Sequence, residues 1–225
     1  MASRVAEYLP GYAWDAVSLR YRNLTTGRFV ARTHILGLLE NFVDAKQRYL
    51  TDLTRAVHEG RIAPATWAAE MRVELKRLHI ASAALGAGGF DRLTSRDYGR
   101  IGGHLAFEYR HLAGMAADLT AEKLTLPQAL NRLRMYLGNA RREFFEAEKD
   151  RRLAQVQPGL AQLGRRLLGA AEHCADCVEY YNRGWQYAVD VPVIGASQCD
   201  GNCRCSIEWR AVPVGEVNAW FGSKR

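Results

Sequence analysis

Thr125-Leu-Pro-Gln128 opens the stretch of sequence that decides the fold class. The T-x-x-Q pattern is a helix capping box, and proline is tolerated in the first turn of a helix. Apolar residues then recur every three or four positions until about Leu153, a spacing that places them on one helix face. They are Leu130, Leu133, Leu137, Phe144 and Ala147. The stretch therefore predicts one long amphipathic helix.

Three further helices are predicted upstream. The first begins with Thr33 as its N-cap and ends at Gly60, because glycine commonly follows the last helical turn. The second starts at Pro64 and continues toward residue 85. The third begins with the capping box Thr94-x-x-Asp97, with Asp in place of the usual Glu or Gln. Together these helices predict a mainly α protein with an elongated helical body.

Two groups of glycines interrupt this pattern. The run Gly86-Ala87-Gly88-Gly89 is interpreted as an interhelical connection, because a phosphate-binding loop needs a preceding strand and a following Lys-Ser/Thr. Gly99, Gly102 and Gly103 fall inside the third predicted helix, where each costs about 1 kcal/mol relative to alanine. We expect the close approach of a neighbouring helix to compensate for that cost.

The two ends of the chain differ from the helical body. Residues 14–21 and 28–30 are interpreted as short extended pieces around the Thr-Gly turn at 23–27, a β-hairpin-like segment. Residues 160–171 are interpreted as a further helical piece that leads into a small module with short strands. The predicted units are the extended N-terminal segment 1–32, the helical body 33–157 and the Cys-rich zinc-binding module 158–225, described as a zinc knuckle.

All cysteines of the chain lie in that last unit. They are Cys174, Cys177, Cys199, Cys203 and Cys205. Such a cluster indicates either a disulfide framework, which needs an oxidising compartment, or thiolates around a metal. The first ten residues lack the apolar core of a signal peptide, and no window is apolar enough to span a membrane. These features favour a metal.

The spacing of the cysteines suits Zn²⁺. Cys174-x-x-Cys177 lets two thiolates face one tetrahedral ion, and Cys199-x-x-x-Cys203-x-Cys205 offers the other half. We expect Cys174, Cys177, Cys203 and one of Cys199 or Cys205 to bind, with the choice between the last two left open. The neighbouring His173 is a sixth candidate ligand. A redox-active dithiol and inert reduced thiols remain alternatives.

Charge and motifs narrow the function classes. The formal net charge of +7 is compatible with nucleic acid or an acidic partner. Arginines crowd the helix 130–155, but they alternate with acidic residues, which predicts a solvated face with pairs such as Glu148 and Arg152. There is no H-E-x-x-H, G-x-S-x-G or Walker sequence among the motifs, so we expect no enzyme.

The order of these motifs resembles tailed-phage head-morphogenesis proteins, also called minor head or minor capsid proteins. The tail of the chain, with C-x-x-C followed by Cys203-Arg-Cys205, is similar to the tail of that family. The run 134–148 is similar to the helix that precedes that tail, and residues 21–30 look like an N-terminal element of some phage-encoded relatives. Family tails often carry His-Pro before the final C-R-C, and the resemblance implies that Cys199 replaces that histidine.

The resemblance implies a nonenzymatic virion structural protein. Such a protein would be oligomeric in the particle, contact the portal or major capsid protein, and assist head assembly or DNA packaging and delivery. It would lie in the head or portal region of the virion, and in the host cytoplasm during assembly. The alternative function is a zinc-dependent nucleic-acid-binding module that uses the basic helix 130–155.

Overall fold

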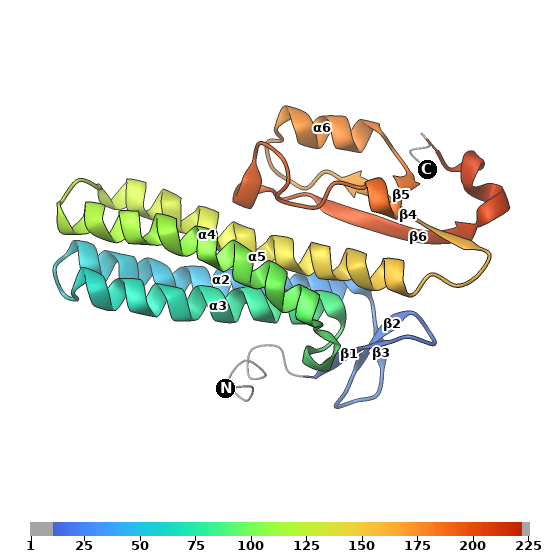
Figure 1. Ribbon diagram of the computed structural model, residues 1–225, viewed down its shortest axis with the longest axis horizontal. Helices are drawn as coiled ribbons and strands as arrows, with labels where there is room; N and C mark the ends of the chain where they lie inside the picture. Colours follow the sequence, from blue (N-terminus) through green and yellow to red (C-terminus); the bar gives the residue numbers. More distant parts are fainter. Residues whose placement is uncertain (1–10, 222–225) are drawn as a thin grey trace.

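Four long helices make up most of the computed structural model, which describes residues 11–221 (Figure 1). They are α2 (Arg32–His58), α3 (Pro64–Ala87), α4 (Ser95–Thr120) and α5 (Leu126–Ala154). The prediction of a mainly α protein with an elongated helical body is confirmed. None of the helices in the described range combines the length and apolarity that a membrane crossing requires.

The helix starts follow their local signals, with one exception. The capping boxes Thr94/Asp97 and Thr125/Gln128 are both present, and Pro64 lies in the first turn of α3. The prediction of Thr33 as N-cap is wrong, because α2 begins at Arg32 after Ala31, which makes no side-chain cap. The first turn of α2 is held instead by Arg32, whose guanidinium donates two hydrogen bonds to Glu148 of α5, at 2.6 and 2.7 Å.

Glycines shape the bundle differently from the prediction. Gly86 belongs to α3, and a β-carbon there would lie 2.1 Å from the Phe144 carbonyl oxygen, so it permits close packing of α3 on α5. The interhelical connection therefore starts only at Gly88. In contrast, the close approach expected at Gly99, Gly102 and Gly103 is absent, because nothing lies within 4 Å of a β-carbon built at any of them. These three glycines lie on the exposed face of α4.

A small N-terminal sheet packs at one end of the bundle. Its antiparallel order is β1-β2-β3, with β1 at Tyr12–Asp15, β2 at Arg20–Asn23 and β3 at Phe29–Val30. The predicted hairpin around the Thr-Gly turn corresponds to β2 and β3, and β1 is an additional strand. The Tyr21 hydroxyl donates to the Leu85 carbonyl at 2.9 Å, which fastens the sheet to the end of α3.

The C-terminal unit is a second three-stranded sheet covered by the short helix α6 (Ala175–Asn182) (Figure 1). Its central strand β4 (Leu160–Leu167) lies between β5 (Gln186–Tyr187) and β6 (Ser206–Pro213). The helical interpretation of residues 160–171 is therefore wrong. Residues of β4 pair in antiparallel register with β6 over all eight positions, and this pairing, distant in sequence, outweighs the local helical pattern.

Several charged side chains of α5 are buried rather than solvated. Glu148 and Arg152 do pair, at 3.2 Å, but the Glu148 side chain is fully buried. Its second carboxylate oxygen accepts a hydrogen bond from the Trp209 indole at 3.0 Å. Earlier in α5, Arg141 and Glu143 are also buried. The predicted solvated face is thus wrong here, and Glu148 joins α2, α5 and β6 through a single buried carboxylate.

Candidate metal centre

All five cysteines converge beside α5, and none forms a disulfide. Their sulfur atoms make two groups of three, and the members of each group lie within 4.8 Å of one another. The first group is Cys174, Cys177 and Cys199, and the second is Cys177, Cys203 and Cys205. The structure thus brings together every residue that the sequence nominated as a ligand, in a cluster that could hold a metal ion.

Helix α6 positions the first two cysteines. Cys174 is the N-cap residue of this helix, with extended backbone angles, and Cys177 follows in its first turn with no solvent exposure. The N-cap and N3 side chains of a helix point toward one another. The carboxylate of Asp176 accepts a hydrogen bond from the Gln198 backbone N–H at 2.9 Å. This bond fastens the segment that carries Cys199 to the start of α6.

The second segment returns its cysteines to the same place. Cys177 Sγ lies 3.5 Å from Cys199 Sγ and 3.7 Å from Cys203 Sγ. A tetrahedral ion with metal–sulfur bonds of about 2.3 Å holds its sulfur ligands about 3.8 Å apart. The Ser197 hydroxyl lies beside this group, 3.1 Å from Cys199 Sγ and 3.4 Å from Cys177 Sγ. The donor set and its spacing therefore fit a thiolate-bound metal ion.

Two glycines allow residues 191–205, the cysteine loop, to contact α5. A β-carbon at Gly138 of α5 would lie 1.5 Å from the Gly201 carbonyl oxygen, and one at Gly201 would lie 2.4 Å from the Met135 carbonyl oxygen. Only glycine permits this contact between two backbones. Gly201 belongs to the 3₁₀ turn Asp200–Asn202, which leads directly to Cys203. The pair therefore sets how far Cys203 stands from α5.

Two buried arginines fix the same cysteine. Arg141 of α5 donates to the Cys203 carbonyl oxygen. Arg166 of β4 donates to the Pro192 and Val193 carbonyls at 2.8 and 3.2 Å, and its Nη1 lies 3.9 Å from Cys203 Sγ. Sequence reasoning missed Gly138, Gly201 and Arg166, because their roles depend on contacts between distant segments.

The thiols differ in their tendency to ionise. A hydrogen bond from the Cys205 thiol lowers the pKa of Cys203 to about 4, and the same bond raises the pKa of Cys205. Burial raises the pKa of Cys174, but hydrogen bonds with Cys177 and Cys199 outweigh it and bring the value to about 7. Burial raises the pKa of Cys177 and of Cys199. The metal-free cluster therefore favours thiolates at Cys203 and Cys174, and metal binding would release protons from the others.

His173 lies at the edge of the cluster. Its Nδ1 is 3.7 Å from Cys205 Sγ, and its Nε2 is 2.9 Å from the Gly169 carbonyl oxygen. A carbonyl oxygen accepts hydrogen bonds and cannot donate them, so Nε2 carries the proton in this arrangement. The lone pair of neutral His173 is then on Nδ1, the nitrogen that faces the cysteines. Within residues 11–221, no further cluster of His, Cys, Asp and Glu has metal-binding spacing.

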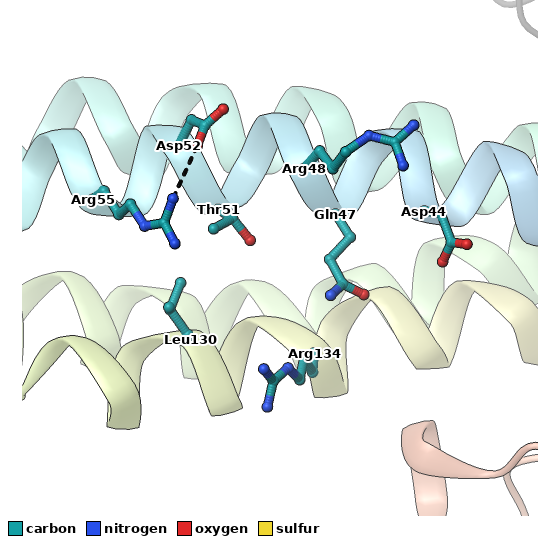
Figure 2. Close-up of a pocket in the computed structure, with 8 residues that line it drawn as sticks. All are labelled: Asp44, Gln47, Arg48, Thr51, Asp52, Arg55, Leu130 and Arg134. Atoms are coloured by element: carbon teal, nitrogen blue, oxygen red, sulfur yellow. Dashed lines mark hydrogen bonds and ion pairs between the residues drawn. The ribbon is translucent and has the colours of Figure 1, made fainter.

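A separate polar groove lies between α2 and α5, away from the cysteines (Figure 2). It has a volume of about 490 Å³. Arg48 and Arg55 line it from α2 and Arg134 lines it from α5, while Asp52 pairs with Arg55 at 3.5 Å. Asp44 also lines the groove, so its lining combines three arginines with two aspartates and has a small positive excess.

Comparison of the chain with protein-family models, curated proteins and solved structures found no significant match. The resemblance to phage head proteins therefore rests on the motifs of this sequence alone. The metal centre is supported independently of it, by the geometry of the five thiols.

Proposed function

We propose that this chain is a nonenzymatic structural protein of a tailed-phage virion, a minor head protein near the portal. One observation carries the proposal: the C-x-x-C and C-R-C motifs, on which the resemblance rests, converge on the helix that precedes them. In this function the long bundle supplies a rigid body. The cysteine centre fixes the orientation of the tail on that body, so that it can contact the portal or major capsid protein.

The metal in this proposal is Zn²⁺. Zinc takes four thiolate or imidazole ligands in a tetrahedral arrangement and has no redox chemistry. These properties suit a structural ion that links two segments of the chain, which we call the zinc staple. Cys174, Cys177 and Cys203 are the ligands expected from the sequence, and Cys177 lies in a group with Cys174 and in a second group with Cys203. Cys199 and Cys205 both lie close enough to Cys177 to contribute. A redox dithiol is disfavoured by the presence of five thiols on two different segments, because such a site needs only two thiols.

Metal analysis tests the staple. The purified full-length chain should contain zinc and lose it to a strong chelator, and its thermal unfolding temperature should then fall. Metal binding contributes directly to folding at such sites. The variant Cys177→Ser should unfold at this lower temperature even without chelator. The control variant His58→Ala, which changes an exposed residue and keeps Cys177, should unfold at the same temperature as the native chain. A chain free of metal after preparation in zinc-containing medium would contradict the staple.

Composition of the particle tests the virion role. Quantitative mass spectrometry of purified phage particles should find this chain at a low copy number relative to the major capsid protein. Cross-linking should join it to the portal protein or to the major capsid protein. Its complete absence from intact particles and from assembling heads would exclude the virion role, and this result would leave the metal centre unaffected.

The groove between α2 and α5 favours a second candidate function, nucleic-acid binding. Arg48 and Arg55 line it from α2 and Arg134 lines it from α5 (Figure 2), and arginine side chains are common phosphate ligands. This candidate predicts DNA affinity that falls steeply as salt increases. Arg48→Glu combined with Arg134→Glu should weaken binding at least tenfold, while Lys76→Glu combined with Arg96→Glu, the same charge change at exposed positions of α3 and α4, should have little effect. Equal loss in both proteins would exclude the groove.

A further inference from the structure

We propose that the cysteine centre holds two metal ions of the zinc type, bridged by the Cys177 thiolate, with His173 as a ligand. This inference rests on the metal-binding part of the proposed function and is independent of the virion role. The number of donors motivates it. A tetrahedral ion uses four ligands, whereas six donor side chains gather here: the five cysteines and His173.

The arrangement of the sulfur atoms favours two metal-ion positions over a single one. Ligands of a single tetrahedral ion lie about 3.8 Å from one another. Instead, the described thiols separate into two groups of three, and Cys177 is the one member that both groups share. Its sulfur lies 3.5 Å from Cys199 Sγ in one group and 3.7 Å from Cys203 Sγ in the other. Cys177 thus occupies the place of a bridging ligand.

The first position is formed by Cys174, Cys177 and Cys199. These three thiols come from the start of α6 and from the segment that Asp176 fastens to it. The Ser197 hydroxyl lies 3.1 and 3.4 Å from two of these sulfurs and can donate a hydrogen bond to either. With three protein ligands, this position takes its fourth ligand from solvent.

The second position is formed by Cys177, Cys203 and Cys205. His173 stands outside this group of three with its Nδ1 facing Cys205 Sγ, and it becomes the fourth ligand by moving toward Cys177 and Cys203. For metal–sulfur and metal–nitrogen bonds of about 2.3 and 2.0 Å, a tetrahedral ion places sulfur and nitrogen about 3.5 Å apart. The observed separation of Cys205 Sγ and His173 Nδ1 is 3.7 Å. The hydrogen bond from Nε2 to the Gly169 carbonyl orients the ring in the manner usual for a metal-binding histidine.

Charge balance agrees with two ions. Two divalent ions and five thiolates sum to a charge of −1, and the buried Arg166 guanidinium beside Cys203 supplies +1. A single ion with four ligands would leave one buried thiol and His173 without a role. Buried charges persist in proteins when they are compensated locally, and the two-ion arrangement meets that condition with side chains already in place.

The experiment counts the ions. The zinc-saturated full-length chain, measured by mass spectrometry under non-denaturing conditions, should carry two zinc ions. His173→Ala and Cys205→Ser should each retain one, and Cys199→Ser should also retain one. His173 is only half-buried, so its replacement should preserve the fold, which far-UV circular dichroism would verify. His58→Ala is the matched control and should retain two ions.

Cobalt provides a second readout that does not depend on mass. When Co²⁺ replaces zinc, a bridging thiolate couples the two ions magnetically. The electron paramagnetic resonance signal per cobalt should therefore be weaker at two equivalents than at one. Saturation at one ion, or two ions retained in His173→Ala, would overturn the two-ion proposal while leaving the single zinc staple intact. A chain that binds no ion would overturn the staple as well.

Discussion

Nδ1 of His79 lies 3.3 Å from Oε1 of Glu143, and both side chains are completely buried between α3 and α5. On the other side of the ring, Nε2 lies 3.2 Å from a Glu108 carboxylate oxygen on α4. Glu143 is contacted in turn by His104 and Arg100, both from α4. A histidine between two carboxylates therefore joins three helices inside the bundle.

This histidine makes the bundle sensitive to alkaline pH. Burial lowers the pKa of His79, but hydrogen bonds and charge interactions with Glu108 and Glu143 outweigh it and raise the pKa to about 9. In the unfolded chain the value is about 6.5. The stabilisation is therefore complete below about pH 6.5 and is lost as the pH rises through 9. The shift corresponds to about 3 kcal/mol of unfolding free energy.

We expect the unfolding free energy of the native chain to fall relative to that of His79→Gln as the pH rises from about 6.5 to about 9.5. Urea titrations across this range measure both proteins. Cysteine ionisation affects the two equally and cancels in the difference. His111→Gln, a change at an exposed histidine of α4, is the control and should follow the native curve. Parallel curves for His79→Gln and the native chain would show that His79 is neutral in the folded state.

Glu148 should contribute to the loss of stability in acid. Burial raises the pKa of this carboxyl, but Arg32 and the neighbouring arginines outweigh it and lower the value to about 2. Its stabilisation is present above the unfolded value of about 4.5 and is lost as the pH falls through 2. Glu148→Ala would remove the hydrogen-bond acceptor of the Trp209 indole and the charge partner of the buried Arg151. We expect a loss of about 3–5 kcal/mol in unfolding free energy.

Thermal and urea unfolding would measure this loss. Glu179→Ala is the matched control, because Glu179 forms the same kind of i,i+4 pair with Arg183 on α6 but is exposed. Exposed pairs contribute at most about 1 kcal/mol. Similar losses in the two variants would mean that the buried network around Glu148 adds nothing beyond a surface pair.

The helices were predictable because their signals are local. Thr94, Thr125 and Pro64 mark helix starts through contacts within a few residues, and apolar spacing fixed the buried faces. The predicted ligand cysteines also converged, since their spacing in sequence reflects a shared centre. The domain limits and the phage role remain predictions.

The predictions that were wrong concern features that depend on contacts between distant segments. Residues 160–167 form a strand instead of the predicted helix, because they pair with β6 residues that lie more than 35 positions away in the sequence. The charges of α5 appeared suited to solvent because nothing in their own helix reveals that Arg32 and Trp209 cover Glu148. Likewise, glycine spacing alone could not distinguish Gly86, which contacts Phe144, from the exposed Gly103.

That distinction gives opposite predictions for two helix glycines. Gly103→Ala should stabilise the chain by about 1 kcal/mol, because alanine favours the helix and nothing lies within 4 Å of the new methyl group. Gly138→Ala gains the same propensity, but its methyl group would meet the Gly201 carbonyl. We expect it to displace the turn before Cys203, lower the unfolding temperature and weaken zinc binding. Competition with a chromogenic chelator measures the affinity, and stabilisation by both substitutions would contradict the close contact.

Metal removal should loosen the cysteine loop before it affects the bundle. Cys177, Cys203 and Cys205 are buried in the same core as α5. Without metal, the cysteine loop therefore keeps these apolar contacts but loses the metal–sulfur bonds that join it to α6. The sheet keeps a small core of its own, made by Leu163, Trp185 and their neighbours. Hydrogen exchange followed by mass spectrometry should therefore show faster exchange across residues 191–205 after chelation, with α3 and α5 still protected. Equal acceleration in α3 and the loop would indicate instead that the metal centre and the helical bundle unfold as one cooperative unit.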